Sequence, residues 1–347
     1  MSVSSHDVVT QIRAGRRRRQ IRTRLTMVTL LILVLAIFAL SLMVGRTFYS
    51  LDEVIAVMLG DTVPGASFTV GELRLPRAVT GLLAGFAFGA AGAIFQGMLR
   101  NPLASPDIIG ISAGAGAFAV IGIIALSLSE TAVSFLALGG ALFTAAAIYL
   151  LSNRKGFTSI RFILIGIGVG AMMQSVISYL LSRAASWEIQ SSLQWLTGSL
   201  NGATWQKVAP LAFACVVCVP LLVLGTRALD LLRIGDDAAT ALGVPVRVTR
   251  VALILAAVVL LAFATAAAGP IAFVAFMSGP IAARLVTPGA ALTVPAGVVG
   301  ALLVLVSDLA GQYLFGERYP VGVITGVLGA PYLILLLIRR NRTGSSL

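Results

Sequence analysis

The chain has 347 residues, of which 58% are hydrophobic and 11% are charged, whereas soluble domains average about 45–50% apolar and about 25% charged residues. This composition argues against a water-soluble globule. The 25 Lys and Arg residues outnumber the 13 Asp and Glu residues, for a net charge of +12, which by itself would also suit a nucleic-acid partner. Two cysteines and one histidine, His6, are too few for a disulfide framework or an all-protein zinc site.

Stretches without charged residues recur along the chain at the length of about 20 residues that a transmembrane helix needs. The stretch from Val251 to Ala283 is longer, at 33 residues, and Gly269-Pro270 interrupts it, which predicts a long helix followed by a short one. The sequence therefore predicts an all-α, polytopic membrane bundle of ten transmembrane helices with a short eighth member. The other uncharged stretches cover residues 25–45, 78–99, 108–129, 131–153, 162–182, 208–226, 285–307 and 319–338.

The first uncharged stretch, residues 25–45, follows a basic run and so resembles a secretory signal. Its 21 residues exceed the about 7–15 of a signal's apolar region, and Gly45-Arg46-Thr47-Phe48 is not a small-residue cleavage site. We therefore predict that it is the first span. This divides the chain into a basic cytoplasmic tail of residues 1–24, a transmembrane domain of residues 25–340 and a short cytoplasmic tail of residues 341–347.

The basic residues distribute unequally between the two sides that ten spans define. Cytoplasmic termini place 19 Lys and Arg residues inside and 6 outside, as the positive-inside rule requires. The run from Arg16 to Arg19 is then a topology determinant beside an anionic leaflet. This distribution favours a membrane protein over a nucleic-acid-binding one.

Few polar side chains fall inside the predicted spans. Asp308 is the only ionisable candidate deep in a span, whereas carriers driven by protons or sodium usually have more. Gln96 and Gln174 are candidates to line a pathway, and hydrogen bonds between helices are the alternative. Cys215 and Cys218, one helical turn apart without His or carboxylate neighbours, indicate inert packing.

Two connections differ from simple loops. All three tryptophans, at positions 187, 195 and 205, lie in one outer connection, which predicts a segment along the membrane interface. The inner connection from Arg227 to Arg250 predicts two short amphipathic helices broken at Gly235. Such a pair either docks a cytoplasmic partner or lies on the membrane surface. The chain has no P-loop motif, so ATP would have to be bound by another subunit.

A series of specific motifs lies between about residues 50 and 340. They are Leu73-Arg-Leu-Pro-Arg77, Gly92-Ala-Ile-Phe-Gln96, Arg100-Asn-Pro-Leu-Ala-Ser-Pro-Asp107, Trp195-Leu-Thr-Gly-Ser-Leu-Asn-Gly-Ala-Thr-Trp205, Gly235-Asp-Asp-Ala238, Ala268-Gly-Pro-Ile-Ala-Phe-Val274 and Pro320-Val-Gly-Val323. In order and spacing this series resembles the permease subunits of iron-chelate and cobalamin ABC importers, the FecCD/BtuC type. The Gly-Ser-Leu-Asn-Gly stretch and Gly235-Asp-Asp are most similar to the subgroup that imports ferric enterobactin.

The resemblance implies the type II ABC importer permease fold in a bacterial plasma (inner) membrane. It implies two permease subunits, the second identical or homologous, two ATPase subunits that hold ATP and Mg, and a periplasmic or lipoprotein siderophore-binding protein. This chain would bind no cofactor or metal and catalyse no covalent chemistry. A ferric siderophore of the enterobactin type is the favoured cargo, with cobalamin or haem as alternatives. A secondary carrier without ATP and a signalling or anchoring subunit are the other classes.

Three sets of residues take family roles by position, as the resemblance implies. The outer-mouth arginines that dock the binding protein are Arg74, Arg77 and Arg318, and the positions of Arg74 and Arg77 near the outer end of the second span also predict exposed cations. The cytoplasmic gate consists of Asn101, Leu103, Thr158 and Ser159. The coupling helices, about residues 228–248, contact the ATPase through Leu231, Leu232, Gly235, Asp236, Asp237, Ala238, Leu242 and Gly243.

The chain departs from the family pattern at three places. Gly279-Pro280 stands where Pro-His is usual, so a role of that histidine is absent. Arg318 replaces a glutamate upstream of Pro320, and Gln312 stands where an outer-mouth arginine is expected. The third docking contact is therefore in question, with Arg318 as the candidate to restore its charge.

Overall fold

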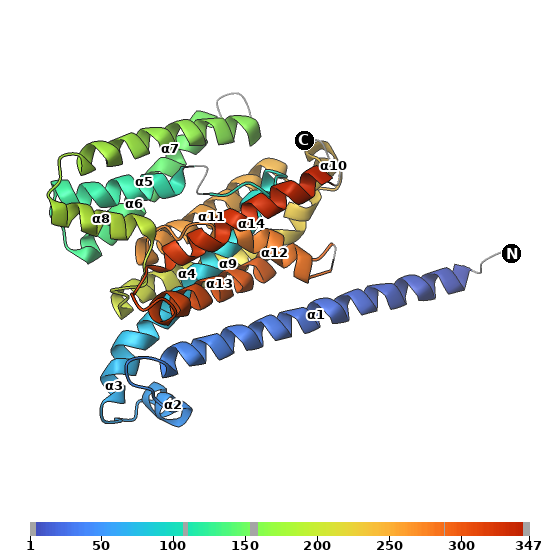
Figure 1. Cartoon of the computed structure of the whole chain (residues 1–347). Helices are drawn as coiled ribbons and strands as arrows, with labels where there is room; N and C mark the ends of the chain where they lie inside the picture. Colours follow the sequence, from blue (N-terminus) through green and yellow to red (C-terminus); the bar gives the residue numbers. More distant parts are fainter. Residues whose placement is uncertain (1–4, 107–109, 153–158, 288, 343–347) are drawn as a thin grey trace.

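The computed structural model describes residues 5–106, 110–152, 159–287 and 289–342, which form a bundle of helices (Figure 1). Eight helices in this part of the chain are long and apolar enough to cross a membrane, and two shorter apolar helices, Ile111–Ala125 and Val274–Leu285, take the third and eighth places in the series. The all-α polytopic fold and the short eighth helix are as predicted. The third helix is also shorter than its uncharged stretch suggested, so eight of the ten predicted helices reach the length of a full span in the described residues.

The helices of Figure 1 have the following bounds. They are α1 Ser5–Met43, α2 Leu51–Leu59, α3 Ala66–Phe68, α4 Leu75–Met98, α5 Ile111–Val120, α6 Glu130–Ser152, α7 Ser159–Leu181, α8 Ser186–Thr197, α9 Trp205–Arg233, α10 Asp236–Ala241, α11 Val246–Ala268, α12 Val274–Leu285, α13 Thr293–Tyr313 and α14 Val321–Arg342. Two π-helical turns, η1 Thr69–Arg74 and η2 Ile121–Ala125, adjoin α4 and α5.

Helix α4 is the centre of the bundle, because α9, α11, α12 and α13 all pack against it. Helices α5 to α8 form a neighbouring layer, and α1 runs along the edge beside α13 (Figure 1). The helices run back and forth between two ends, which we call the α8 end and the α10 end after the helix at each. Helix α1 begins and α14 finishes at the α10 end (Figure 1).

Small residues bring α4 into close contact with its neighbours, as their four-residue spacing predicts. A Cβ atom at Gly85 would lie 2.6 Å from the Gly300 carbonyl oxygen of α13, and one at Gly89 would overlap the Ala296 carbonyl. At Gly92 a Cβ atom would overlap the Ala275 carbonyl of α12. The central packing therefore depends on the absence of side chains on three successive turns of α4.

We expect Gly89→Ala to destabilise the bundle by about 1–3 kcal/mol, since an added methyl group in a packed core forces the backbones apart. Thermal unfolding of the purified protein in detergent measures this loss. Gly139→Ala is the matched control, because nothing lies within 4 Å of a Cβ atom there. Equal melting temperatures for the two variants would contradict the packing argument.

The connection between α9 and α11 differs from the prediction of two short helices. Residues 227–233 continue α9 without a break, and only α10 is a separate short helix. Leu, Ala and Arg favour helix continuation, and no glycine or proline follows Gly225 before Gly235, which interrupts the helix with a φ of 127°. The break at Gly235 is as predicted, and so is the one at Gly269, where φ is 70°.

Candidate functional site

The loop after α4 holds two of the predicted gate residues, Asn101 and Leu103. Arg100 turns the chain with a φ of 51°, and the Asn101 backbone N–H donates to the Gln96 carbonyl at 3.1 Å. The Asn101 Oδ1 accepts from the Leu103 N–H at 2.9 Å. The asparagine side chain therefore fixes this loop by a local turn. Of the other gate candidates, Thr158 lies outside the described residues and Ser159 is the first residue of α7.

Gln96, predicted to line a pathway, meets the gate loop at a cavity of about 340 Å³ near the α10 end, with Asn101 also in its wall. The Gln96 amide donates to the Phe276 carbonyl of α12 at 3.0 Å. Gly279 permits this contact, because a Cβ atom there would overlap the Gln96 Oε1. Gln96 thus combines both alternatives, a helix-to-helix hydrogen bond and a cavity wall. Gln174 lies exposed on α7 and lines none of the cavities described here.

Asp236, at the start of α10, joins this helix to the gate loop. Its carboxylate lies 2.8 Å from the Arg100 Nη2 and 2.9 Å from the Arg250 Nη2 of α11. Arg100 also donates to the Leu232 carbonyl through Nε and Nη2, at 3.1 and 2.7 Å. The end of α9, α10, the start of α11 and the gate loop are therefore linked through two arginines and one carboxylate.

The remaining predicted coupling residues surround this link. Leu232 is buried, whereas Leu242 and Asp237 are exposed. Gly235 and Gly243, with positive φ of 127° and 84°, delimit α10. The exposed side chains of Asp237 and Leu242 form the surface at α10, and Leu231 and Ala238 are half-buried beside them.

Arg74, one of the predicted docking arginines at the α8 end, is half-buried and folds back on its own chain. Its guanidinium donates to the carbonyls of Leu42, Met43 and Thr47 at 2.6–2.9 Å. It also lies 5.0 Å from the centroid of the Tyr49 ring, within cation–π range. Arg74 therefore holds the end of α1 against the π-helical turn before α4.

Arg77 is engaged in the same way, with a carboxylate on α13. Its Nε and Nη2 form a two-point ion pair with Asp308 at 2.9 and 2.7 Å, and its Nη1 donates to the Asn201 Oδ1 at 2.6 Å. Gln312 adds a hydrogen bond to Asp308 at 2.8 Å. The Asp308 side chain is only 6% exposed and that of Arg77 20%. The expectation of exposed cations at both positions is therefore wrong, although their docking role stays a prediction.

Sequence reasoning missed the partners of Arg77. Asp308 was recognised as an ionisable residue in a span, and such a residue requires a counter-ion, but 231 positions separate it from Arg77. The i, i+4 spacing of Asp308 and Gln312 on one helix face was the available signal for their hydrogen bond. Arg318, by contrast, is exposed in the loop between α13 and α14.

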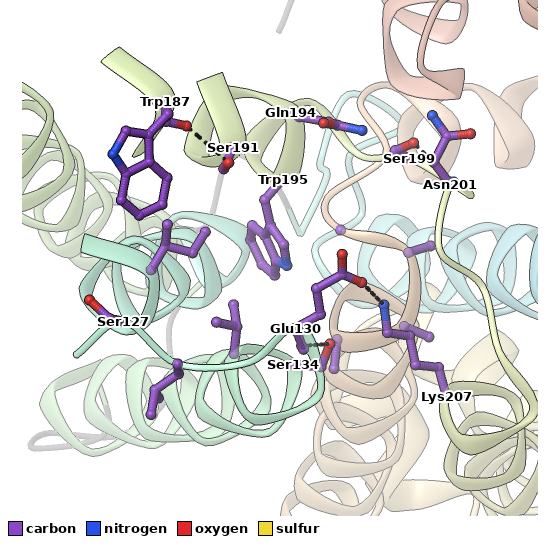
Figure 2. A pocket seen from close by; sticks show the side chains of 17 residues that line it. Ser127, Glu130, Ser134, Trp187, Ser191, Gln194, Trp195, Ser199, Asn201 and Lys207 are labelled. Carbon is purple, nitrogen blue, oxygen red and sulfur yellow. Dashed lines mark hydrogen bonds and ion pairs between the residues drawn. The ribbon is translucent and has the colours of Figure 1, made fainter. Parts of the chain in front are cut away.

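A second cavity, of about 310 Å³, opens at the α8 end (Figure 2). One face of α8 supplies Trp187, Ser191, Gln194 and Trp195, whose spacing of four, three and one places them together. The opposite wall comes from the start of α6 and the end of α11. Lys207 and Glu130, which both line the cavity, form an ion pair of 3.2 Å. The tryptophan connection predicted to lie at the interface thus forms one wall of a polar and aromatic pocket.

Comparison with known proteins identifies close relatives. The model described as the FecCD transport family matches residues 31–339. The ferric enterobactin transport system permease protein FepG of Escherichia coli (strain K12) is 39% identical over 299 residues, 86% of this chain and 91% of its own. The achromobactin transport system permease protein CbrC of Dickeya dadantii (strain 3937) is 39% identical over 335 residues, 95% and 96% of the two chains.

The chain is less similar to a permease of a cobalamin system and to one solved transporter structure. The cobalamin import system permease protein BtuC of Halobacterium salinarum is 34% identical over 278 residues, 80% of this chain and 75% of its own. A solved metal-chelate type ABC transporter in an inward-facing conformation superimposes with a TM-score of 0.79 at 25% identity, over 91% of this chain and 99% of that one.

Proposed function

Because the chain belongs to the FecCD transport family, the permease subunits of siderophore and cobalamin ABC importers, we propose that it passes a ferric siderophore across the plasma membrane by alternating access. In this role the chain is a translocation subunit, as its relatives are permeases. Its cargo would arrive on a binding protein, and ATP would be hydrolysed by separate ATPase subunits that hold ATP and Mg. A second permease subunit, homologous or identical, would complete the pathway.

The cargo proposal rests on the relatives that cover most of the chain. The two described at 39% identity carry enterobactin and achromobactin systems in their names, so a siderophore is a better supported cargo than cobalamin, whose relative is 34% identical. Within siderophores, the family motifs favour the enterobactin type, a catecholate chelate. Iron would travel inside the chelate, which supplies its ligands.

The link through Asp236 supports ATP coupling as the drive. We place the α10 end in the cytoplasm, where its exposed surface would meet the ATPase. A movement of α10 would then reach the gate loop directly, because Asp236 and Arg100 are 2.8 Å apart. Docking at the α8 end would use the exposed Arg318, and Arg74 and Arg77 would dock the binding protein only by leaving the contacts that now hold the surrounding surface in place. Alternation between outward-open and inward-open states follows when ATP binding favours one position of α10.

Uptake into proteoliposomes tests this function. We expect vesicles with this chain, the second permease and the ATPase to accumulate labelled ferric catecholate only when ATP and the binding protein are supplied. Ferric carboxylate siderophore and cobalamin are the comparison cargos, and a catecholate preference of about tenfold corresponds to about 1.4 kcal/mol. Uptake driven by a proton gradient without the ATPase, or equal uptake of all three cargos, would contradict the proposal in its mechanism or in its cargo.

A further inference from the structure

The cavity at the α8 end takes no part in the transport cycle proposed above. Its volume of about 310 Å³ suits one small polar group, and its tryptophan-bearing helix lies at the end of the spans, where indole rings favour the headgroup layer. Figure 2 shows the Trp195 ring and the Glu130 carboxylate directed into the same space, with Trp187 at its border.

The two charged side chains that line this cavity form an ion pair in which the carboxylate is the exposed member. The Lys207 ammonium donates to Glu130 at 3.2 Å and to the Gly202 carbonyl at 3.0 Å, and its side chain is only 12% exposed. The Glu130 side chain is 81% exposed, and within the described part of the chain its ion pair with Lys207 uses only the Oε2 atom. A ligand entering the cavity therefore meets a carboxylate before it meets the buried lysine.

Two aromatic faces reinforce this preference for a cation. The indole rings of Trp187 and Trp195 line the cavity from one face of α8, and the faces of indole rings attract ammonium groups. The hydroxyl of Ser127, in the loop between η2 and α6, and the amide of Gln194 on α8 also line the cavity, and each can donate to an anionic group. A carboxylate, indole faces and neutral donors together suit a zwitterion with one ammonium and one phosphate.

We propose that this cavity binds an organic ammonium group carried beside a phosphate, the chemistry of an ethanolamine headgroup. The source is either an ethanolamine phospholipid of the surrounding leaflet or a soluble phosphoethanolamine compound. A polyanionic ferric catecholate, by contrast, carries no ammonium group for the carboxylate and the indole faces to bind. The assignment does not depend on the proposed transport function, because its test requires only the folded chain.

Tryptophan emission of the full-length chain in nanodiscs tests the assignment. Trp205 lies outside the cavity, so in a Trp205→Phe background the emission reports on the two cavity tryptophans. We expect glycerophosphoethanolamine to change this emission saturably and glycerol 3-phosphate, which lacks the ammonium, to leave it unchanged. An equal response to both compounds overturns the proposal.

Variants and lipids complete the test. Glu130→Gln is expected to weaken the response about tenfold or more, since a hydrogen bond to a charged group is lost, while Glu317→Gln, an exposed carboxylate outside the cavity, is expected to have no effect. If Glu130→Gln fails to fold, Trp187→Leu replaces it, because Trp187 is 63% exposed.

An emission difference between ethanolamine-phospholipid and phosphatidylglycerol nanodiscs identifies a lipid source. The absence of that difference, together with a response to the soluble compound, identifies a soluble source. No response to either source, or one that survives these variants, overturns the assignment.

Discussion

Replacing Asp236 by Arg is expected to abolish most ATP-dependent uptake while leaving the bundle folded. The new cation would face Arg100 and Arg250, which both lie within 3 Å of the native carboxylate, so α10 would be repelled from the gate loop. The Arg100–Asp236 ion pair is about half exposed and contributes at most about 1 kcal/mol to stability. Loss of a coupling free energy lowers uptake by about 5- to 150-fold. Proteoliposome uptake and thermal unfolding, measured on the same preparation, separate the two effects.

Asp237→Arg is the matched control, because Asp237 is exposed on the same helix and takes part in none of these ion pairs. We expect it to retain more uptake than Asp236→Arg. A cycle of Arg100→Ala, Asp236→Ala and the double variant then measures the link itself, since residues that act as one unit show non-additive losses. Equal uptake losses for the Asp236 and Asp237 reversals, with additive Ala variants, would place the effect at the ATPase surface and not in the link.

The fold could be predicted from the sequence because a bilayer leaves few alternatives to helices of a set length. The charge-free stretches located the long spans, and Gly269-Pro270 located the break before the short α12. The third span was overestimated because hydropathy records composition and not backbone geometry. Residues 108–129 are uncharged, but the helix begins only at Ile111 and changes to a π-helical turn at Ile121.

The sites could be predicted only in part, because contacts between distant segments leave no local pattern. Gly235 was recognisable as a break, and Asn101 through the motif that contains it. The ion pair of Asp236 with Arg100 joins residues 136 positions apart. No sequence pattern around either residue indicates that the two are in contact. The exposure of Arg74 and Arg77 was misjudged for the same reason, because their carbonyl and carboxylate partners lie elsewhere in the sequence.

Removing the side chain of Arg77 is expected to have the largest effect on stability. Arg77→Ala would leave the Asp308 carboxylate, 6% exposed, without its counter-ion, and breaking a buried ion pair costs about 3–5 kcal/mol. A corresponding fall in the temperature of thermal unfolding in detergent measures the loss. Arg318→Ala is the control, because Arg318 is exposed and its removal leaves stability within about 0.5 kcal/mol.

Arg77→Met combined with Asp308→Leu distinguishes the structural role of Arg77 from docking. Apolar side chains of similar size remove both buried charges at once, and such replacements are often neutral for stability. We expect the double variant to regain both the thermal stability and most of the uptake lost in Arg77→Ala, because each guanidinium nitrogen of Arg77 already donates to Asp308 or Asn201 within the chain. A double variant that is as stable as the native chain but still fails to take up cargo from the binding protein would instead show that the partner's carboxylate displaces Asp308 and that Arg77 docks it.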